Sequence, residues 1–176
     1  MGSILMKELI EAMSLLARDE RVIFIGQSIC YPGHIMYNTL EHIEESRKIE
    51  LPVAEDMQMG ISIGLSLEGY IPVSIYPRMD FLIIAANQLV NHLDKIEEMS
   101  DGEFMPKVII RTMIGCTSPF HPGPQHCQDH TKALQEMLTN IEVIKIIRKS
   151  DILSTYEYAL ENEKSTIIVE TPELYN

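Results

Sequence analysis

Two side chains could carry acid–base chemistry, and each stands where a loop follows an apolar run. Glu55 comes directly after "ELPVA", and His126 lies in the loop "GCTSPFHPGPQHCQDH" that follows "KVIIRTMI". A carboxylate held in a poorly solvated site can donate or share a proton, and a histidine can act as an acid, a base or a ligand of an anionic group. We therefore treat Glu55 and His126 as candidate catalytic residues.

A simpler interpretation of the acids is available from helix physics. Acidic residues are common where a helix begins, because they complement the positive end of its dipole. On this interpretation Asp56 caps the following helix and Glu55 points to solvent. Residue types alone leave the two interpretations of Glu55 open.

The His- and Cys-containing loop also allows several interpretations. A zinc site would use His126 and His130 on one helical face, but the spacing matches no standard structural zinc pattern. The histidines could equally be surface residues of an ordered proline-rich loop, or one of them could be catalytic. We expect no metal ligands on this chain.

Two glycines and an aromatic cluster are the remaining candidates. Gly60 and Gly64 are four residues apart and so share one helical face, and each costs about 1 kcal/mol relative to Ala in a helix interior. They predict a close approach, either by the chain's own sheet or by a second chain. The aromatics from Tyr76 to Phe81 are typical of a core, although one could offer a flat face to a planar ring.

The elements that must position these residues alternate along the whole chain. Strands are expected at 21–27, 48–53, 71–77, 107–114, 141–147 and 165–172, and helices at 3–19 (capped by Ser3), 38–46, 56–68, 80–100, 130–140 and 150–161. This alternation predicts an α/β fold of three layers, in which a mainly parallel six-stranded sheet carries helices on both faces. The expectation is one domain over 1–176. Ligands of such folds bind beyond the carboxyl ends of the strands, here at the loops 26–37, 53–57, 76–81 and 114–129.

Composition narrows the functional classes. The 176 residues include 14 basic and 26 acidic side chains, a formal net charge of −12, which argues against binding to nucleic acid or to an anionic membrane. No apolar run has the length of a membrane span and no signal peptide is recognisable, so we expect a cytoplasmic protein. The motifs GxGxxG, GxxxxGK[ST] and GxSxG are absent from the sequence, which removes the usual phosphate-binding loops and the hydrolase nucleophile turn.

Several segments, in order, resemble a known family. "PVAEDMQMGISIG" is similar to a strand end "P-[IL]-S-E" followed by a helix with "G-I-A-x-G", and "ARDERVIFIGQ" is similar to "A-R-D-x-R-V-x-x-x-G-E". "GPQHCQ" and "STIIVETPELY" are similar to "x-x-Q-H-S-Q" and "P-V-x-x-x-E-x-x-x-L-Y". The chain thus resembles the pyrimidine-binding, transketolase-like domain of thiamine-diphosphate enzymes, above all the beta subunit of the 2-oxo acid (pyruvate or branched-chain) dehydrogenase first component.

The resemblance implies roles for particular residues. Glu55 matches the glutamate that hydrogen-bonds a ring nitrogen of the cofactor's aminopyrimidine and shares a proton there. Phe81 matches the aromatic that packs on that ring, and Ala54 and Met57 count among the cofactor-binding residues. His126 matches an active-site histidine that faces the reacting carbon and contacts the substrate's carboxylate or carbonyl.

The resemblance also implies a partner. This chain lacks the family's "GDG…N" signature for magnesium and diphosphate, and it stops where the family's carboxyl-terminal domain would begin. A separate subunit would then hold Mg²⁺ and the diphosphate of a shared thiamine diphosphate, and a heterotetramer is the simplest closed assembly. Gly60, Gly64 and Gln88 are the expected interface residues. One departure is "GQS" at 26–28, where the family has "G-E-D", so that Gln27 and Ser28 lack its charges.

The expected function follows from this resemblance. The chain would be the pyrimidine-binding subunit of a heteromeric enzyme that cleaves or forms a C–C bond next to a carbonyl, on a 2-oxo acid. The outcome would be that of a decarboxylase or carboligase, or that of an oxidoreductase similar to the dehydrogenases. Two alternatives remain, a split transketolase-like enzyme acting on sugars and a non-catalytic interaction module that retains the fold.

Overall fold

The sheet has the predicted number and direction of strands. The computed structural model describes residues 6–118 and 121–175. Every strand pair is parallel, in the order β2-β1-β3-β4-β6-β5. The strands are β1 (Val22–Gly26), β2 (Lys48–Glu50), β3 (Ile71–Tyr76), β4 (Ile109–Met113), β5 (Glu142–Ile146) and β6 (Thr166–Glu170).

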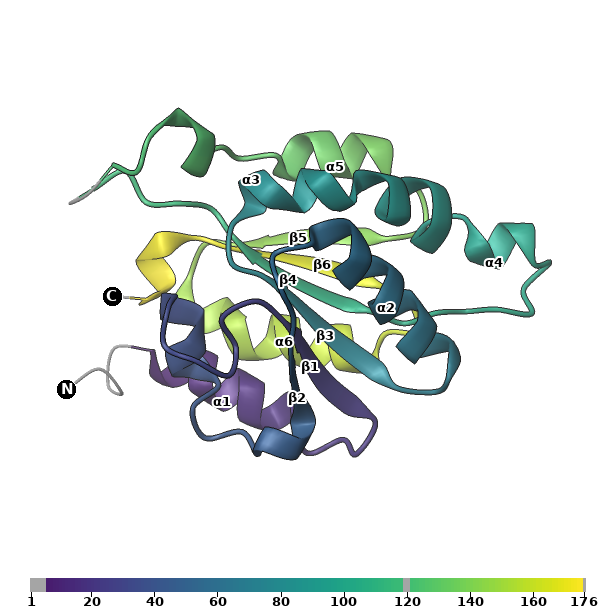
Figure 1. Cartoon of the computed structure of the whole chain (residues 1–176), viewed down its shortest axis with the longest axis horizontal. Coiled ribbons are helices and arrows are strands. Elements are labelled where there is room, and N and C mark those ends of the chain that lie inside the picture. Colours follow the sequence, from purple (N-terminus) through teal and green to yellow (C-terminus); the bar gives the residue numbers. More distant parts are fainter. Residues whose placement is uncertain (1–5, 119–120, 176) are drawn as a thin grey trace.

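Helices cover both faces of this sheet, which confirms the three-layer α/β prediction. In Figure 1, α1 and α6 lie on one face, while α2, α3 and α5 lie on the other. The helices are α1 (Lys7–Leu16), α2 (Glu55–Leu67), α3 (Met79–Leu82), α4 (Ile96–Met99), α5 (Thr131–Met137) and α6 (Ile152–Glu161). Shorter helical turns are η1 (Ile35–Thr39), η2 (Glu45–Arg47), η3 (Ile83–Ala85), the π-helical η4 (Gln88–Leu93), η5 (Pro124–His126), η6 (Lys149–Asp151) and η7 (Pro172–Tyr175).

The central strands are apolar at successive positions because both of their faces are buried. Successive side chains of a strand point to opposite faces, so Ile109 joins the core under α1 and α6 while Ile110 joins the core under α2 and α5. Ile168 and Ile167 of β6 divide in the same way. Continuous apolar runs are typical of parallel sheets covered on both sides.

Two predicted elements are wrong in their extent. The strand expected at 48–53 ends at Glu50, and Pro52 beyond it has no N–H with which to extend the ladder. The helix expected at 38–46 is replaced by η1 and η2, and Thr39 ends η1 by bonding its own hydroxyl to the Met36 carbonyl at 2.7 Å. The Ser3 cap lies outside the described residues.

The long helix expected at 80–100 is also broken, into α3, η3, η4 and α4. At its wide turn the Asp94 N–H reaches back five residues to Leu89. The buried Asp94 carboxylate accepts backbone hydrogen bonds from Thr139, Asn140 and Ile141. The spacing of apolar residues could not reveal this break, because the break accompanies a contact between Asp94 and a segment some 45 residues away.

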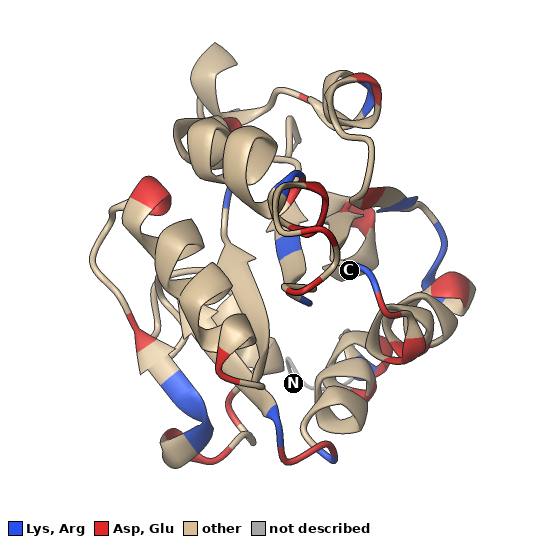
Figure 2. Ribbon diagram, turned by 90° about the vertical axis from the view of Figure 1, so that its right-hand side faces the viewer, with Lys and Arg blue, Asp and Glu red and all other residues tan. Residues whose placement is uncertain are grey.

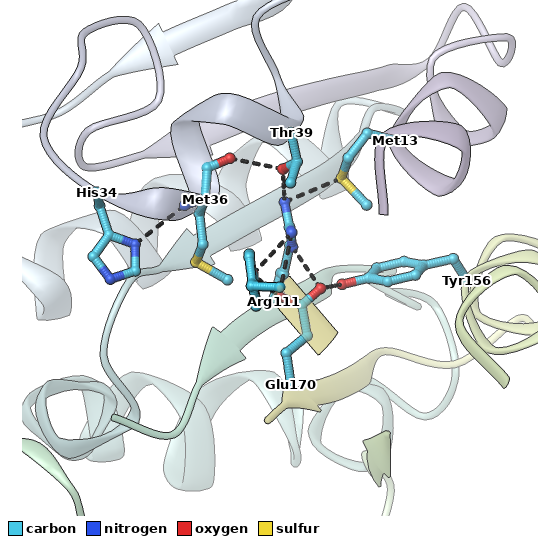
Figure 3. A network of polar contacts seen from close by, with 8 residues as sticks. Met13, His34, Met36, Thr39, Arg111, Tyr156 and Glu170 are labelled. Atoms are coloured by element: carbon cyan, nitrogen blue, oxygen red, sulfur yellow. Dashed lines mark hydrogen bonds and ion pairs between the residues drawn. The ribbon is translucent and has the colours of Figure 1, made fainter. Parts of the chain in front are cut away.

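A buried ion pair joins the sheet to its α1 and α6 side (Figure 3). Arg111 of β4 and Glu170 of β6 are fully buried, and the Arg111 Nε lies 2.9 Å from Glu170 Oε1. The hydroxyls of Tyr156 and Tyr175 donate to the same carboxylate, and Arg111 also donates to the Thr39 hydroxyl at 2.8 Å. Burial, followed by the charge of Glu170, raises the pKa of both tyrosines well above the ordinary value. Every charge in this group therefore has partners.

Candidate functional site

A pocket of about 400 Å³ opens beyond the carboxyl ends of β1, β2 and β3. This is the edge of the sheet where the sequence predicted ligand binding. Three of the four predicted loops contribute to its wall. Its lining residues are Gln27, Ser28, Gly33, His34, Val53, Glu55, Tyr76, Pro77, Arg78, Phe81 and Ile84.

Glu55 lies in this wall as the first residue of α2. It is only 5% exposed, and the Tyr76 hydroxyl donates to its backbone carbonyl at 3.3 Å. Within the described parts of the chain its carboxylate receives no hydrogen bond and makes no ion pair. A carboxylate placed at a pocket wall without a protein partner is available to a ligand.

The prediction that Asp56 caps the helix is wrong. Ala54 occupies the N-cap position, and no side chain there accepts a hydrogen bond. Asp56 lies one residue inside the helix and is exposed, where it can still complement the helix dipole. The interpretation in which Glu55 points to solvent is wrong as well, because its side chain is buried.

Helix α2 is fixed on β3 by buried polar contacts one turn beyond Glu55. The Gln58 amide donates to the Ile75 carbonyl at 2.9 Å and to the Ser74 hydroxyl at 3.1 Å. Ser62 lies 2.9 Å from the same Ser74 hydroxyl. These bonds set the height of α2 along the strand and so hold Glu55 at the strand end.

Phe81 and His126 come together beside the pocket. Their ring centroids are 5.4 Å apart with an interplanar angle of 81°, an edge-to-face contact. His126 itself does not line the pocket in the described residues, and it joins the site through Phe81. It lies in η5 and His130 lies at the N-cap of α5, so the two do not share a helical face.

The segment that carries His126 is held from two sides. The buried Asp80 carboxylate accepts from the backbone N–H and the side-chain amide of Gln128, at 3.0 and 3.2 Å. On the other side Gly115 passes so close that an added Cβ would lie 1.6 Å from the His126 carbonyl oxygen. The position of His126 therefore depends on residues that the sequence did not single out.

Sequence reasoning missed two polar lining residues, His34 and Arg78. Burial, together with the positive charges of Arg78 and Arg111, lowers the pKa of His34 to about 4, so its ring is neutral near pH 7. Both residues stand in segments that follow β1 and β3, and this position at strand ends was the available signal. A lone Arg and a lone His carry no motif of their own.

The loop after β1 is shaped by one carboxylate. Glu50 accepts hydrogen bonds from the backbone N–H groups of Ser28, Ile29 and Cys30 at 2.7 to 2.8 Å. Ser28 takes a φ of 54°, a left-handed conformation that non-glycine residues adopt rarely. Glu50 thus compensates for a strained backbone in the pocket wall.

Some predicted residues lie apart from the pocket. Ala54 and Met57 are not among its lining residues, and Met57 is 42% exposed. A Cβ added to Gly60 or Gly64 would meet nothing within 4 Å among the described residues. The interpretation in which these glycines let the helix approach its own sheet is therefore wrong. Gln88 is half-buried in η4.

Apolar side chains extend outward from the pocket over α2 and the turn after α3. They are Val53 (78% exposed), Met57, Ile61, Ile83 (49%) and Ile84 (54%), which we call the α2 face. Figure 2 shows Lys and Arg dispersed among more numerous acidic residues over the molecule. A run of exposed apolar side chains in so acidic a protein marks a surface suited to contact with another molecule.

Two features are absent from the described residues. In residues 6–118 and 121–175 no three His, Cys, Asp or Glu side chains are grouped so that they could hold a metal ion. Among the same residues no helix has the length and hydrophobicity needed to cross a bilayer.

Comparison with known proteins confirms the resemblance read from the sequence. The chain is 24% identical over 164 residues to the 2-oxoisovalerate dehydrogenase subunit beta of Bacillus subtilis, a match covering 90% of this chain and 48% of the relative. It is 25% identical over 173 residues to the pyruvate dehydrogenase E1 component subunit beta of Cyanidium caldarium, covering 92% and 49%. The chain thus spans about half the length of the curated relatives it matches. No protein-family profile matches the chain.

Solved structures confirm the fold. A structure described as "Split gene transketolase, inactive beta4 tetramer" superposes with a TM-score of 0.69 at 17% identity, covering 94% of this chain and 49% of the other. Transketolase from Campylobacter jejuni superposes with a TM-score of 0.69 at 14% identity, covering 93% and 24%. The chain therefore has the fold of the part of these transketolase structures that it covers.

The pocket fits the group that the sequence resemblance implies. An aminopyrimidine offers ring nitrogens and a flat face, and the pocket presents the unpartnered Glu55 carboxylate and the Phe81 ring. The residues present therefore suit that part of thiamine diphosphate.

Proposed function

We propose that this chain is the pyrimidine-binding subunit of a heteromeric thiamine-diphosphate-dependent enzyme. The reaction cleaves or forms a C–C bond next to the carbonyl of a 2-oxo acid, with a decarboxylase, carboligase or dehydrogenase-like outcome. The observation that carries the proposal is the Glu55 carboxylate, which is buried in a pocket wall and has no partner in the described part of the chain. The similarity to 2-oxo acid dehydrogenase beta subunits supports the substrate class.

The chain's own residues have distinct tasks in this proposal. When bound, the cofactor supplies the electron sink for a carbanion beside a carbonyl. Glu55 shares a proton with a ring nitrogen of the pyrimidine, and its burial keeps water from competing for that proton. Phe81 offers its ring to the pyrimidine face.

His126 acts on the substrate rather than on the pyrimidine. Its edge-to-face contact with Phe81 places the imidazole at the border of the site. From there it can donate a hydrogen bond to the substrate's carbonyl or carboxylate. The Asp80–Gln128 contact and the close approach of Gly115 keep its backbone in place.

A partner subunit completes the site in this proposal. It would hold Mg²⁺ and the diphosphate and would dock on the α2 face, with Gly60, Gly64 and Gln88 in the contact. The open space beside both glycines supports this docking, since residues without side chains let a second chain approach the helix closely. Two copies of each chain would form a heterotetramer. The cytoplasmic location stays a prediction.

The test uses the chain co-purified with a partner that carries the "GDG…N" signature. We expect the pair to bind thiamine diphosphate with Mg²⁺ in calorimetry and to turn over a 2-oxo acid. Glu55→Gln removes the proton that the carboxyl shares but keeps its shape, so turnover should fall at least about 100-fold.

Glu68→Gln at the far end of the same helix is the matched control and should leave turnover unchanged. A pair that binds no cofactor would overturn the proposal in favour of a non-catalytic interaction module. Near-normal turnover of Glu55→Gln would remove Glu55 from the chemistry.

A further inference from the structure

Apart from Glu55 and Phe81, the pocket wall is rich in hydrogen-bond donors. Arg78 follows β3, and Gln27, Ser28 and His34 follow β1. We call these four residues the donor corner. None of them has a role in the proposed handling of the pyrimidine.

Arg78 is a cation that has no hydrogen-bond or ion-pair partner for its side chain among the described residues. It lies at the N-cap of α3, half-buried, and in the described residues no carboxylate is within 4.0 Å of it and no acceptor takes a hydrogen bond from it. By contrast, Arg47 and Arg111 are bonded to backbone or side-chain acceptors. A guanidinium held at a pocket wall with free N–H groups matches the geometry of a carboxylate or phosphate.

Gln27 provides an independent observation. Its Nε2 atom is buried and has no hydrogen-bond partner in the described residues. A buried donor left unpaired costs about 1–3 kcal/mol, so a group that accepts from it would relieve that cost on binding. An acceptor brought in by a ligand is the natural partner in a pocket wall.

The charges around the corner select for an anion there. His34 is neutral near pH 7, and the cations that face it are Arg78 and Arg111. Glu55 is the acid that lines the pocket, on the wall formed by α2, and the nearby Glu50 carboxylate is engaged by three backbone N–H groups. An anionic group that enters the pocket is drawn to Arg78 and repelled by Glu55, while the net charge of −12 disfavours anions elsewhere on the chain.

We propose that the donor corner binds a second anionic group of the substrate, distal to the reacting carbonyl. The substrate class is thus a 2-oxo acid or related ketone that carries an additional carboxylate or phosphate. This inference rests on the proposed function for the meaning of "substrate", but anion binding at the corner is a property of this chain alone. Arg78 would hold two oxygens, and Gln27 and Ser28 would donate to the same group.

The test needs neither the partner nor the cofactor. The full chain, labelled on its histidine rings, is titrated by NMR with 2-oxoglutarate, with inorganic phosphate and with pyruvate, which lacks the second anionic group. We expect 2-oxoglutarate or phosphate to shift the His34 resonances in a saturable way and to raise the pKa of His34. Pyruvate should bind at least tenfold more weakly.

Variants identify the corner as the place of binding. Arg78→Gln should weaken anion binding at least tenfold. Arg78→Lys keeps the positive charge but loses the paired N–H donors of the guanidinium, so it should weaken anion binding less. Arg18→Gln removes a charge outside the pocket and should change nothing. Gln27→Met is a second test variant in case Arg78→Gln does not fold, and it should weaken anion binding several-fold.

The outcomes distinguish a carboxylate from a phosphate as the bound group, and they test the donor corner separately from the proposed function. Preference for 2-oxoglutarate over phosphate indicates a dicarboxylic substrate, and the reverse indicates a phosphorylated one. An equal loss of anion affinity in Arg18→Gln, or the absence of a saturable shift of the His34 resonances with either anion, would overturn the proposal that the donor corner binds anions. Failure of the assembled pair to bind thiamine diphosphate would overturn the proposed function and leave the anion result standing.

Discussion

Two groups of polar residues in this protein, one around Arg111 and one at the pocket, are arranged in opposite ways. Arg111 and Glu170 bond to each other, and four further side chains bond to one or both of them (Figure 3). At the pocket, Glu55 and Arg78 have no partners among the described residues, and the buried Nε2 of Gln27 is unpaired.

The contrast separates two uses of buried polarity. A satisfied network holds elements together, because breaking it leaves a buried charge without compensation. An unsatisfied group costs folding free energy and persists where a ligand completes it. Substitutions in the first group should therefore cost stability, and substitutions in the second should cost binding.

The largest expected loss of stability comes from Glu170→Ala. It leaves the fully buried Arg111 without its counter-ion, so the free energy of unfolding should fall by about 3–5 kcal/mol in urea denaturation. Glu173→Ala, an exposed acid three residues on, should change it by less than about 0.5 kcal/mol. A loss below about 1 kcal/mol for Glu170→Ala would contradict the structural role of the network.

Acid should destabilise the protein through His34, which lies near cations of both groups. Its pKa is about 4 in the folded chain against 6.5 as an ordinary value. The unfolded state therefore takes up a proton below pH 6.5, while the folded state does so only near pH 4. The free energy of unfolding present above pH 6.5 should decrease by about 2–3 kcal/mol as the pH falls to 4.

Urea denaturation at a series of pH values between 7 and 4 measures this slope. His34→Gln should flatten it, whereas His121→Gln, at an exposed position, should leave it as in the parent chain. An unchanged slope in His34→Gln would assign the acid sensitivity to other groups.

Gly115→Ala tests whether His126 is positioned by its backbone. The new methyl group would overlap the His126 carbonyl oxygen, so the segment must move, at a cost of about 1–3 kcal/mol. The His126 ring resonance should shift in NMR spectra and the assembled enzyme should lose turnover. Ser118→Ala, in the same loop but exposed, is the control, and equal effects from both variants would refute the contact.

The smallest effect, and one of opposite sign, is expected at Gly60. Because its surroundings are open, Gly60→Ala should stabilise the isolated chain by about 0.5–1 kcal/mol through helix propensity. The same methyl group should weaken association with the partner subunit at least tenfold in calorimetry. Glu157→Ala, in α6 on the other side of the sheet, should leave association with the partner unchanged. Unimpaired assembly of Gly60→Ala would mean that the partner docks on another surface.

The sequence predicted what depends on local pattern. Alternating apolar runs predicted all six strands and both layers of helices, because burial on two faces leaves a continuous apolar signature. Glu55 was singled out by its position at a strand end, whereas Phe81 was singled out by the family resemblance, which also favoured a catalytic role for Glu55. The shared pocket wall that joins them is consistent with that prediction.

What the sequence did not predict depends on distant contacts. The π-turn η4 accompanies the bonds of Asp94 to residues 139–141, and no local period signals such a requirement. The position of Ala54 rather than Asp56 at the N-cap is set by how α2 sits on β3. Arg78 and His34 became visible only when their loops met around one cavity.

The Glu50 carboxylate has a consequence for how this site can change. It fixes the loop after β1 through three backbone N–H groups, and backbone groups are the same whatever side chains the loop carries. Position 28 can therefore take any residue with an N–H without loss of this anchor, whereas Ile29 is fully buried in the core. A change of side chain at position 28 can therefore alter what the pocket wall contacts, while the backbone of the loop keeps its course.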